Sequence, residues 1–341
     1  MNTLQEYSTP RSSGNLKRAM TLIALFLLLV AAFIISLSVG AAKVSLSGAF
    51  RSIVSGENSV DLRIILYIRL PRVFGAVIAG AALAVSGIII QAVLQNPMAA
   101  PNLIGVNAGA GFFVICAMAF LPQFIGQLPL AAFLGALLAA LLIYAISAFT
   151  GAGRVTVTLV GIAVGSILTA GINTVKTLFP DSVYDVSGFL IGGLSTSNLA
   201  SVTHATLIII PALVLSVIFS RGLDALSLGG AVARGIGVNV FRARLMWLVL
   251  AAMLAGAAVS FCGLIGFVGL IVPHIMRKLI GGNHVFLIPA SIFGGALLLL
   301  TTDTLARTLF VPYELPVGII LSLVGGPFFI FLLLLERRTE R

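Results

Sequence analysis

Long apolar segments separated by short polar ones run through almost the whole sequence. The main apolar segments are residues 22–39, 73–93, 112–121, 128–149, 158–170, 207–219, 245–259, 285–301 and 317–335. A helix needs about 20 apolar residues to cross the hydrocarbon core of a bilayer, and most of these segments reach that length with their flanks. Residues 263–275 are shorter and contain Pro273, so we expect a partial or broken span there. The pattern predicts an all-α, polytopic membrane protein with about ten transmembrane helices, because a bilayer leaves no partner for an open sheet edge.

The second half of the chain repeats features of the first. Four residues recur at one constant offset: Gly80, Gly87, Pro97 and Gly105 return as Gly256, Gly263, Pro273 and Gly281. A Val-Gly-Ile sequence also recurs, at residues 160–162 and 317–319. An odd number of predicted crossings separates the copies, so the halves, about 69–178 and 245–335, would form an inverted repeat. Inverted repeats are common in proteins with alternating access. Chance matching remains the alternative, because the chain contains 36 glycines.

Composition and charge agree with a membrane protein. The chain of 341 residues is 60% hydrophobic and 9% charged, whereas soluble domains carry about 25% charged residues. The net charge is +10, but the basic residues gather near residues 11–18, 221–244 and 337–341, as in cytoplasmic segments of membrane proteins. This distribution argues against nucleic-acid binding. We expect polar cytoplasmic tails at residues 1–18 and 336–341 and a single transmembrane domain at residues 19–335.

An ordered set of short motifs resembles one transporter family along nearly the whole chain, from about residue 62 to residue 335. The motifs are Arg69-Leu70-Pro71-Arg72, Gly80-Ala81-Ala82-Leu83, Asn96-Pro97, Leu103-Ile104-Gly105-Val106, Leu228-Gly229, residues 233–239 (ARGIGVN), residues 263–270 (GLIGFVGL), Pro273-His274, Glu314-Leu315-Pro316-Val317-Gly318 and Gly326-Pro327-Phe328-Phe329. In this order they resemble the permease subunits of ABC importers for ferric siderophores, haem and cobalamin.

The resemblance implies a permease that moves an iron-siderophore-type chelate across the cytoplasmic membrane of a bacterium or archaeon by alternating access. Its partners would be a second permease in a homo- or heterodimer, two cytoplasmic ATPase subunits, an extracytoplasmic substrate-binding protein and membrane lipid. The chain has no G-x-x-x-x-G-K-[ST] loop, the sequence that binds ATP phosphates in P-loop proteins. We therefore expect a transport subunit rather than an enzyme, with no catalytic or metal site and no cofactor of its own, while the partner ATPase uses ATP and Mg.

Three arginines are predicted to meet the binding protein. Arg69 and Arg72 precede the second predicted helix on the outer side, and Arg307 follows the ninth on the same side. In the family, arginines at these positions contact carboxylates of the binding protein. The planar guanidinium group suits that task because it binds a carboxylate through two parallel hydrogen bonds. The alternative is an interfacial arginine whose charge reaches the lipid headgroups.

The polar connection at residues 221–244 is predicted to transmit the movement of the ATPase. Residues 227–239 can form two short helices, and in the family this element sits in a groove of the ATPase. The coupling residues implied by the resemblance are Leu228, Gly229, Ala233, Arg234, Gly235, Ile236, Gly237 and Val238. Acidic residues that usually follow the Leu-Gly pair are replaced here by Gly230 and Ala231, so Arg234 would carry the docking charge. A solvated basic loop is the alternative.

A gate region is predicted at Asn96, Pro97 and Met98. Proline lacks a backbone donor and crowds the preceding turn, so the second helix must end here. Broken backbone at a membrane face is tolerated where protein or a water-filled cavity receives it. A gate and a simple cytoplasmic turn both satisfy that condition.

An ion-coupled secondary transporter is the alternative function, because such proteins also use inverted repeats. Ion coupling usually requires ionisable groups near the bilayer midplane, and none of the ten acids falls in the middle of an apolar segment. Asp303 lies nearest to a span, toward its outer end. The sequence shows neither paired carboxylates for an enzyme nor a charged ring or filter motif for a channel. An external energy source is therefore favoured.

Overall fold

The computed structural model describes residues 11–40, 44–45, 48, 51–52, 55–56, 59–149, 154–181, 186–195 and 197–339, and these residues form helices and no strand. The helices are α1 (Arg11–Ser38), α3 (Val60–Ile64), α4 (Leu70–Leu94), α5 (Val106–Phe120), α6 (Leu128–Phe149), α7 (Arg154–Leu178), α8 (Val186–Ile191), α9 (Leu199–Ile218), α10 (Ser220–Ser227), α11 (Gly230–Gly235), α12 (Val240–Cys262), α13 (Val268–Ile280), α14 (His284–Thr308) and α15 (Val317–Thr339). A π-helical turn, Ile65–Arg69, joins α3 to α4, and two 3-10 turns, Pro101–Ile104 and Pro122–Gln127, precede α5 and α6. The predicted all-α class is confirmed.

Seven helical segments among the described residues are long and apolar enough to cross a membrane, and two shorter apolar helices, Val106–Phe120 and Val317–Phe331, accompany them. The helix α13 has only 13 residues, in keeping with the partial span expected near Pro273. The break, however, lies before α13. There Gly263 and Phe267 both have positive φ, and Pro273 lies inside the helix. The total of about ten crossings remains a prediction.

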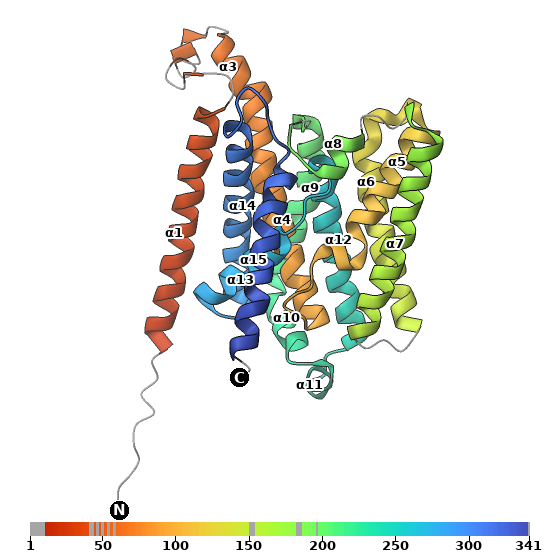
Figure 1. Ribbon diagram of the computed structural model, residues 1–341. Coiled ribbons are helices and arrows are strands. Elements are labelled where there is room, and N and C mark those ends of the chain that lie inside the picture. The colour runs from red at the N-terminus through yellow and green to blue at the C-terminus, as the bar shows by residue number, and fades with distance from the viewer. Residues whose placement is uncertain are drawn as a thin grey trace, which may run out of the picture.

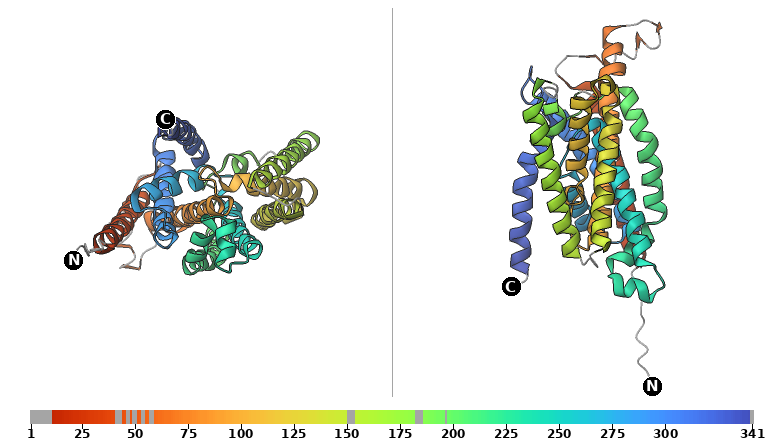
Figure 2. Two further views of the ribbon diagram at one scale, coloured as in Figure 1. Left: turned by 90° about the horizontal axis from the view of Figure 1, so that it is seen from below. Right: turned by 90° about the vertical axis from the view of Figure 1, so that its right-hand side faces the viewer.

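The centre of the bundle is α4. In the apolar 18-residue stretch of the segment that contains α4, 89% of the residues are buried. The corresponding share is 78% for α12, 17% for α7 and 11% for α1. Figure 2 shows α1 and α7 at opposite edges of the bundle. Close approach to α4 depends on glycine. A Cβ added at Gly80 would lie 2.2 Å from the carbonyl oxygen of Gly295 on α14, and one added at Gly87 would lie 1.9 Å from that of Gly269 on α13. Small residues thus let these helices touch through their backbones.

The bundle has two distinct ends, named here by the short helices that lie there (Figure 1). The α11 end carries α10 and α11, and the α3 end carries α3 and α8. The helix α1 starts at the α11 end and α15 finishes there. The helices α4 and α12, the first of each predicted repeat half, run in opposite directions. This is the orientation that an inverted repeat requires; the repeat itself remains a prediction.

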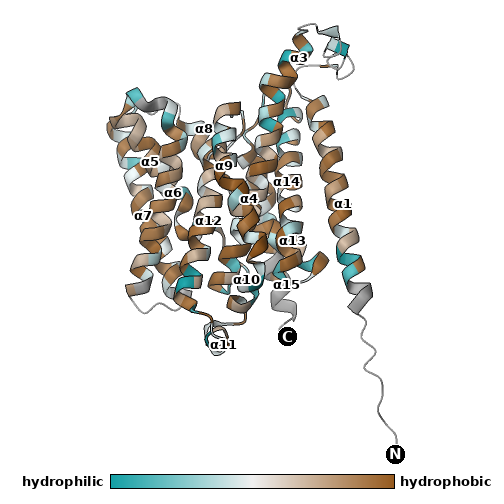
Figure 3. Ribbon diagram, turned by 180° about the vertical axis from the view of Figure 1, so that it is seen from behind, coloured by the Kyte–Doolittle hydropathy of each residue, from teal (hydrophilic) through white to brown (hydrophobic). Residues whose placement is uncertain are grey.

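The predicted tails fall partly outside the described residues, which begin at Arg11 and stop at Thr339. Residues 11–18 are already helical as part of α1, and α15 continues to Thr339. Figure 3 colours most residues of the outer helices as hydrophobic, while teal residues gather toward the two ends. The two ends are therefore where polar chemistry has to be sought.

Candidate docking and coupling sites

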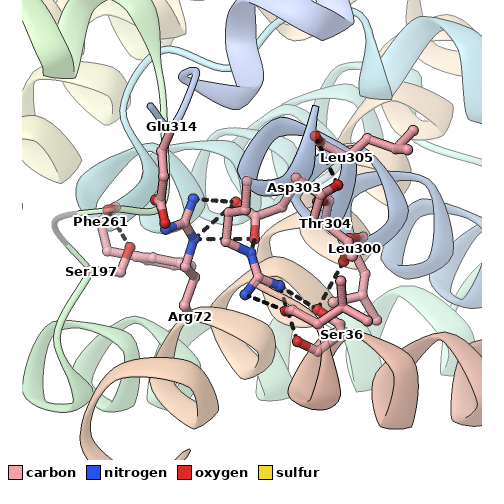
Figure 4. A network of polar contacts seen from close by, with 12 residues as sticks. Ser36, Arg72, Ser197, Phe261, Leu300, Asp303, Thr304, Leu305 and Glu314 are labelled. Atoms are coloured by element: carbon pink, nitrogen blue, oxygen red, sulfur yellow. Dashed lines mark hydrogen bonds and ion pairs between the residues drawn. The ribbon is translucent and has the colours of Figure 1, made fainter. Parts of the chain in front are cut away.

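A buried network of charged groups lies at the α3 end (Figure 4). Arg72 on α4 donates from Nε to both carboxylate oxygens of Asp303 on α14, each at 3.1 Å, and its Nη2 lies 3.0 Å from Asp303 Oδ1. Its Nη1 donates at 2.5 Å to Oε2 of Glu314, in the connection that leads to α15. Arg307 Nε lies 3.2 Å from the second oxygen of Asp303. Asp303 is fully buried, so this carboxylate joins two arginines from two different helices.

Arg69, together with Arg307 of the network, caps the end of α1. Arg69 Nη1 donates to the carbonyl oxygens of Leu37 at 2.5 Å and Ser38 at 2.7 Å. Arg307 donates to the carbonyl oxygens of Val39 and Ser36 and to the Ser36 hydroxyl. The last carbonyl groups of a helix have no partner inside that helix and carry partial negative charge. An arginine there donates the missing hydrogen bonds and also places a positive charge at the negative end of the helix. These bonds fasten α1 to α4 and α14.

The other end of α1 is held by a similar contact. Arg18 donates from Nε to the carbonyl oxygen of Ile280, the last residue of α13, at 3.2 Å. Its guanidinium carbon also lies 5.1 Å from the centre of the Phe286 ring, within the range of a cation–π contact. Arginines thus fasten both ends of a helix that is otherwise poorly buried.

The three predicted docking arginines come together at one end, but their side chains point into the protein. Arg69, Arg72 and Arg307 are 3%, 8% and 3% exposed. Their role in docking is untested and remains a prediction; in this structure they bind acids and carbonyls of their own chain. The sequence did not identify Asp303 and Glu314 as partners of Arg72. The sequence did carry a signal for the other pair of the network, because Asp303 lies four residues before Arg307 on one helix face.

The predicted coupling residues form an exposed tip at the α11 end. Positive φ values at Gly229 and Gly237 (110° and 84°) bracket α11 and set it apart from its neighbours. Ala233 is buried and Val238 partly buried, whereas Arg234 and Gly235 are exposed. Three large apolar side chains stand out on the surface of this segment: Leu228 is 67% exposed, Val232 50% and Ile236 62%. An exposed apolar patch with one arginine is suited to contact another protein.

The predicted gate residues form a tight turn after α4. Gln95 is left-handed, with φ 48°, and ends the helix. The Asn96 side chain accepts a hydrogen bond from the Met98 backbone at 2.9 Å, and Pro97 is exposed. Gln95 Nε2 also donates to the carbonyl oxygens of Leu226 and Ser227, at 2.8 and 3.2 Å. The turn is thus tied to the end of α10, while its role as a gate remains a prediction.

A cavity of about 860 Å³ opens near the α3 end. It lies among α5, α6, α8, α9 and α12 and is lined by Met118, Phe133, Phe189, Asn198, His204 and Phe261, among others. Within the described residues no three His, Cys, Asp or Glu side chains gather as metal ligands would. The described part of the chain thus combines a buried charged network at the α3 end with an exposed apolar tip at the α11 end.

Comparison with known proteins gives a consistent result. The model of the FecCD transport family matches residues 28–335. The hemin transport system permease protein HmuU of Yersinia pestis is 39% identical over 335 residues, covering 96% of this chain and 99% of that protein. The Fe(3+)-citrate import system permease protein YfmD of Bacillus subtilis is 36% identical, covering 96% and 97%. A solved inward-facing metal-chelate type ABC transporter superposes with a TM-score of 0.79 at 29% identity, covering 93% of this chain and 99% of that one.

The chain belongs to the FecCD transport family. It is a transport subunit of an ABC importer, with ATP hydrolysis in a separate subunit, as the sequence analysis predicted. These findings support the importer and give no support to the ion-coupled alternative.

Proposed function

We propose that this chain is the permease through which an iron chelate, of the haemin or ferric citrate kind, crosses the cytoplasmic membrane. The observation that carries the proposal is full-length similarity to permeases named for hemin and Fe(3+)-citrate transport. Both cargoes hold iron inside an organic ligand, which also fits the siderophore-type chelate expected from the sequence. The energy would come from ATP hydrolysis, with Mg as the cofactor, in the partner ATPase.

The α11 end is the cytoplasmic side in this proposal. Arg221, Arg234, Arg242 and Arg244 all belong to the segment at this end, and basic residues are enriched in cytoplasmic loops. The first turns of α1 and the end of α15 lie at the same end, so both termini would be cytoplasmic. The α3 end then faces the binding protein.

The ATPase subunits are proposed to hold the tip formed by residues 227–238. Leu228, Val232 and Ile236 would enter an apolar groove, and Arg234 would meet a carboxylate at its rim. Burial of three exposed aliphatic side chains supplies affinity, while the arginine sets orientation more than affinity. Movement of the tip would pass through α10 and change the conformation of the turn at Asn96, Pro97 and Met98.

The binding protein is proposed to dock on the α3 end. Because Arg72 is already paired, an incoming carboxylate would take the place of Glu314 rather than that of Asp303. The Glu314 side chain is 34% exposed, whereas the Asp303 side chain is fully buried. Arg69 and Arg307 would hold the surface in shape through their bonds to α1.

A second permease, identical or related, is proposed to cover α7. Ser166, Thr169, Asn173 and Lys176 are all exposed and recur at helical spacing along one face. Such a polar face on a membrane helix is favourable where it meets a protein or a water-filled path rather than lipid. Thr169 bonds its own helix, donating to the Gly165 carbonyl oxygen, so it contributes least to the argument. The two copies would enclose the pathway and move by alternating access through inverted repeats.

Purification of the tagged chain from its native membranes tests the proposal. We expect a P-loop ATPase to co-purify, and reconstituted vesicles to take up haemin or ferric citrate only with ATP and a loaded binding protein. A chain that purifies alone and transports without ATP would refute the proposal. ATP-driven uptake of a cargo without iron would refute the cargo assignment alone.

A further inference from the structure

The short helix α10 is bound to the first residue of α14 by an acid that the proposed function leaves unused. One carboxylate oxygen of Asp224 accepts a hydrogen bond from the backbone nitrogen of His284 at 3.0 Å. The same oxygen lies 2.5 Å from Nδ1 of the His284 ring. His284 is 4% exposed, and the Asp224 side chain is about one-third exposed. A single carboxylate therefore holds both the backbone and the side chain of one residue.

The surroundings of His284 make Asp224 its main anchor. The other ring nitrogen, Nε2, is buried without a hydrogen-bond partner. The carboxylate also lies at the N-terminus of α14, where a helix dipole favours negative charge. Arg277 on α13 contributes a nearby positive charge, and its guanidinium is held by Gln91 at 3.0 Å. The ring orientation therefore depends on Asp224, which binds the start of α14 beside the N-cap residue Asn283.

The helix α14 connects this contact to the opposite end of the molecule. Its 25 residues run from His284 to Thr308 and span roughly 37 Å. Near its far end it carries Asp303 and Arg307 of the buried network. Along its length it touches the backbone of α4 at Gly80 and Gly295. The helix contains Pro289 near its start, but it packs directly on α4 through the contact of Gly80 with Gly295, so it offers a continuous path from His284 to the opposite end.

The end of α10 is also bound to α4, because Gln95 donates to the carbonyl oxygens of Leu226 and Ser227. The segment that leads into the coupling tip is thus bound to both α4 and α14, to the first through Gln95 and to the second through Asp224. Leu223 and Leu226 of α10 are buried as well, so apolar packing holds this helix in addition to the two polar contacts.

We infer that Asp224 is a positioning residue that transmits movement of the coupling tip to α14 through His284. The inference rests on the proposed function, since it needs an ATPase that moves the tip. Without this contact α10 stays attached to α4, but α14 no longer follows the movement of α10. ATP hydrolysis then continues while less cargo crosses for each ATP consumed.

The test compares Asp224→Ala and Asp224→Asn in the complete importer, reconstituted with its ATPase, binding protein and iron chelate. ATP hydrolysis and uptake are measured in the same vesicles. For Asp224→Ala we expect hydrolysis close to that of the unmodified importer and a fall of at least about fivefold in cargo moved per ATP, the lower range of allosteric coupling. Asp224→Asn keeps an acceptor oxygen and should fall less. Lys278→Ala removes an exposed charged side chain near the end of α13, outside this contact, and is the control that should change neither quantity.

A double variant separates transmission from simple destabilisation. If the two residues act through one contact, Asp224→Ala combined with His284→Gln should lose no more coupling than Asp224→Ala alone. An unchanged ratio of uptake to hydrolysis in Asp224→Ala would overturn the inference while leaving the proposed function intact. If Asp224→Ala fails to assemble, His284→Gln decides by the same ratio, because it keeps the backbone hydrogen bond. An unmodified chain that assembles no ATPase would overturn both.

Discussion

At the scale of single residues, Asp303 is the most constrained charge in the described part of the chain. It is fully buried and contacts both Arg72 and Arg307. Buried charges are tolerated when paired, and removal of one partner leaves the others without compensation. Glu314 contacts Arg72 too, but from a partly exposed position, where water can replace it. The two acids on one arginine should therefore differ sharply in their contribution to stability.

We predict that Asp303→Ala lowers the free energy of unfolding by about 3–5 kcal/mol, the usual cost of breaking a buried pair. Glu314→Ala should cost about 1 kcal/mol or less, because its partner keeps Asp303 and water screens the lost charge. Thermal unfolding of both purified variants in one detergent measures the difference. Equal losses would contradict the ranking and would mean that Asp303 is not the centre of the network.

At the scale of helices, packing depends on where glycine allows backbone contact. Gly80 and Gly295 face each other closely, and this contact holds α4 to α14. Gly256, which corresponds to Gly80 in the predicted repeat, meets the side chains of Ala136 and Phe133 on α6 instead. The two glycines thus pack against different kinds of surface.

Gly80→Ala should destabilise the protein by about 1–3 kcal/mol, since an added methyl group overpacks the contact and forces the helices apart. Gly165→Ala on α7 is the matched control, because a Cβ there meets nothing within 4 Å. It should be neutral or stabilise by a few tenths to about 1 kcal/mol through the better helix propensity of alanine. Thermal unfolding of the pair provides the measurement, and similar behaviour of the two variants would argue against the contact.

The helix α1 depends on arginine more than on burial. Arg69→Met keeps an apolar stem but removes the donors to Leu37 and Ser38. We predict faster hydrogen exchange in the last turn of α1, by roughly tenfold for each 1.4 kcal/mol lost. Arg63→Met, an exposed arginine at the same end, should leave the exchange unchanged. Unchanged exchange in Arg69→Met would show that Arg307 alone is sufficient to hold α1.

At the scale of the whole molecule, the apolar pattern was sufficient to predict the helical membrane class, and the ordered motifs were sufficient to predict the family. The pattern could not predict that the helix after Gly263 starts only at Val268, because the break depends on two residues with positive φ. Nor could it predict that Arg72 turns inward. Its partners Asp303 and Glu314 lie more than 230 positions away in sequence, and such contacts follow from packing rather than from local spacing. The exposed segment at residues 228–238 was easier to predict, because polar residues and glycines interrupt the apolar pattern there; its coupling role remains a prediction.

The coupling tip also provides the clearest test of how the two ends work together. Arg234→Glu reverses the charge of an exposed side chain, so the stability of the isolated chain should change by less than about 0.5 kcal/mol. Association with the ATPase, or the coupling of hydrolysis to uptake, should weaken, since a like charge now faces the proposed carboxylate. Lys278→Glu makes the same charge change at the exposed end of α13, near the α11 end, and should leave uptake unaltered. If both variants lose uptake equally, the loss results from the change in net charge at the α11 end, and Arg234 has no specific role. Loss in Arg234→Glu alone would assign ATPase contact to the tip, while the network around Asp303 remains intact at the opposite end.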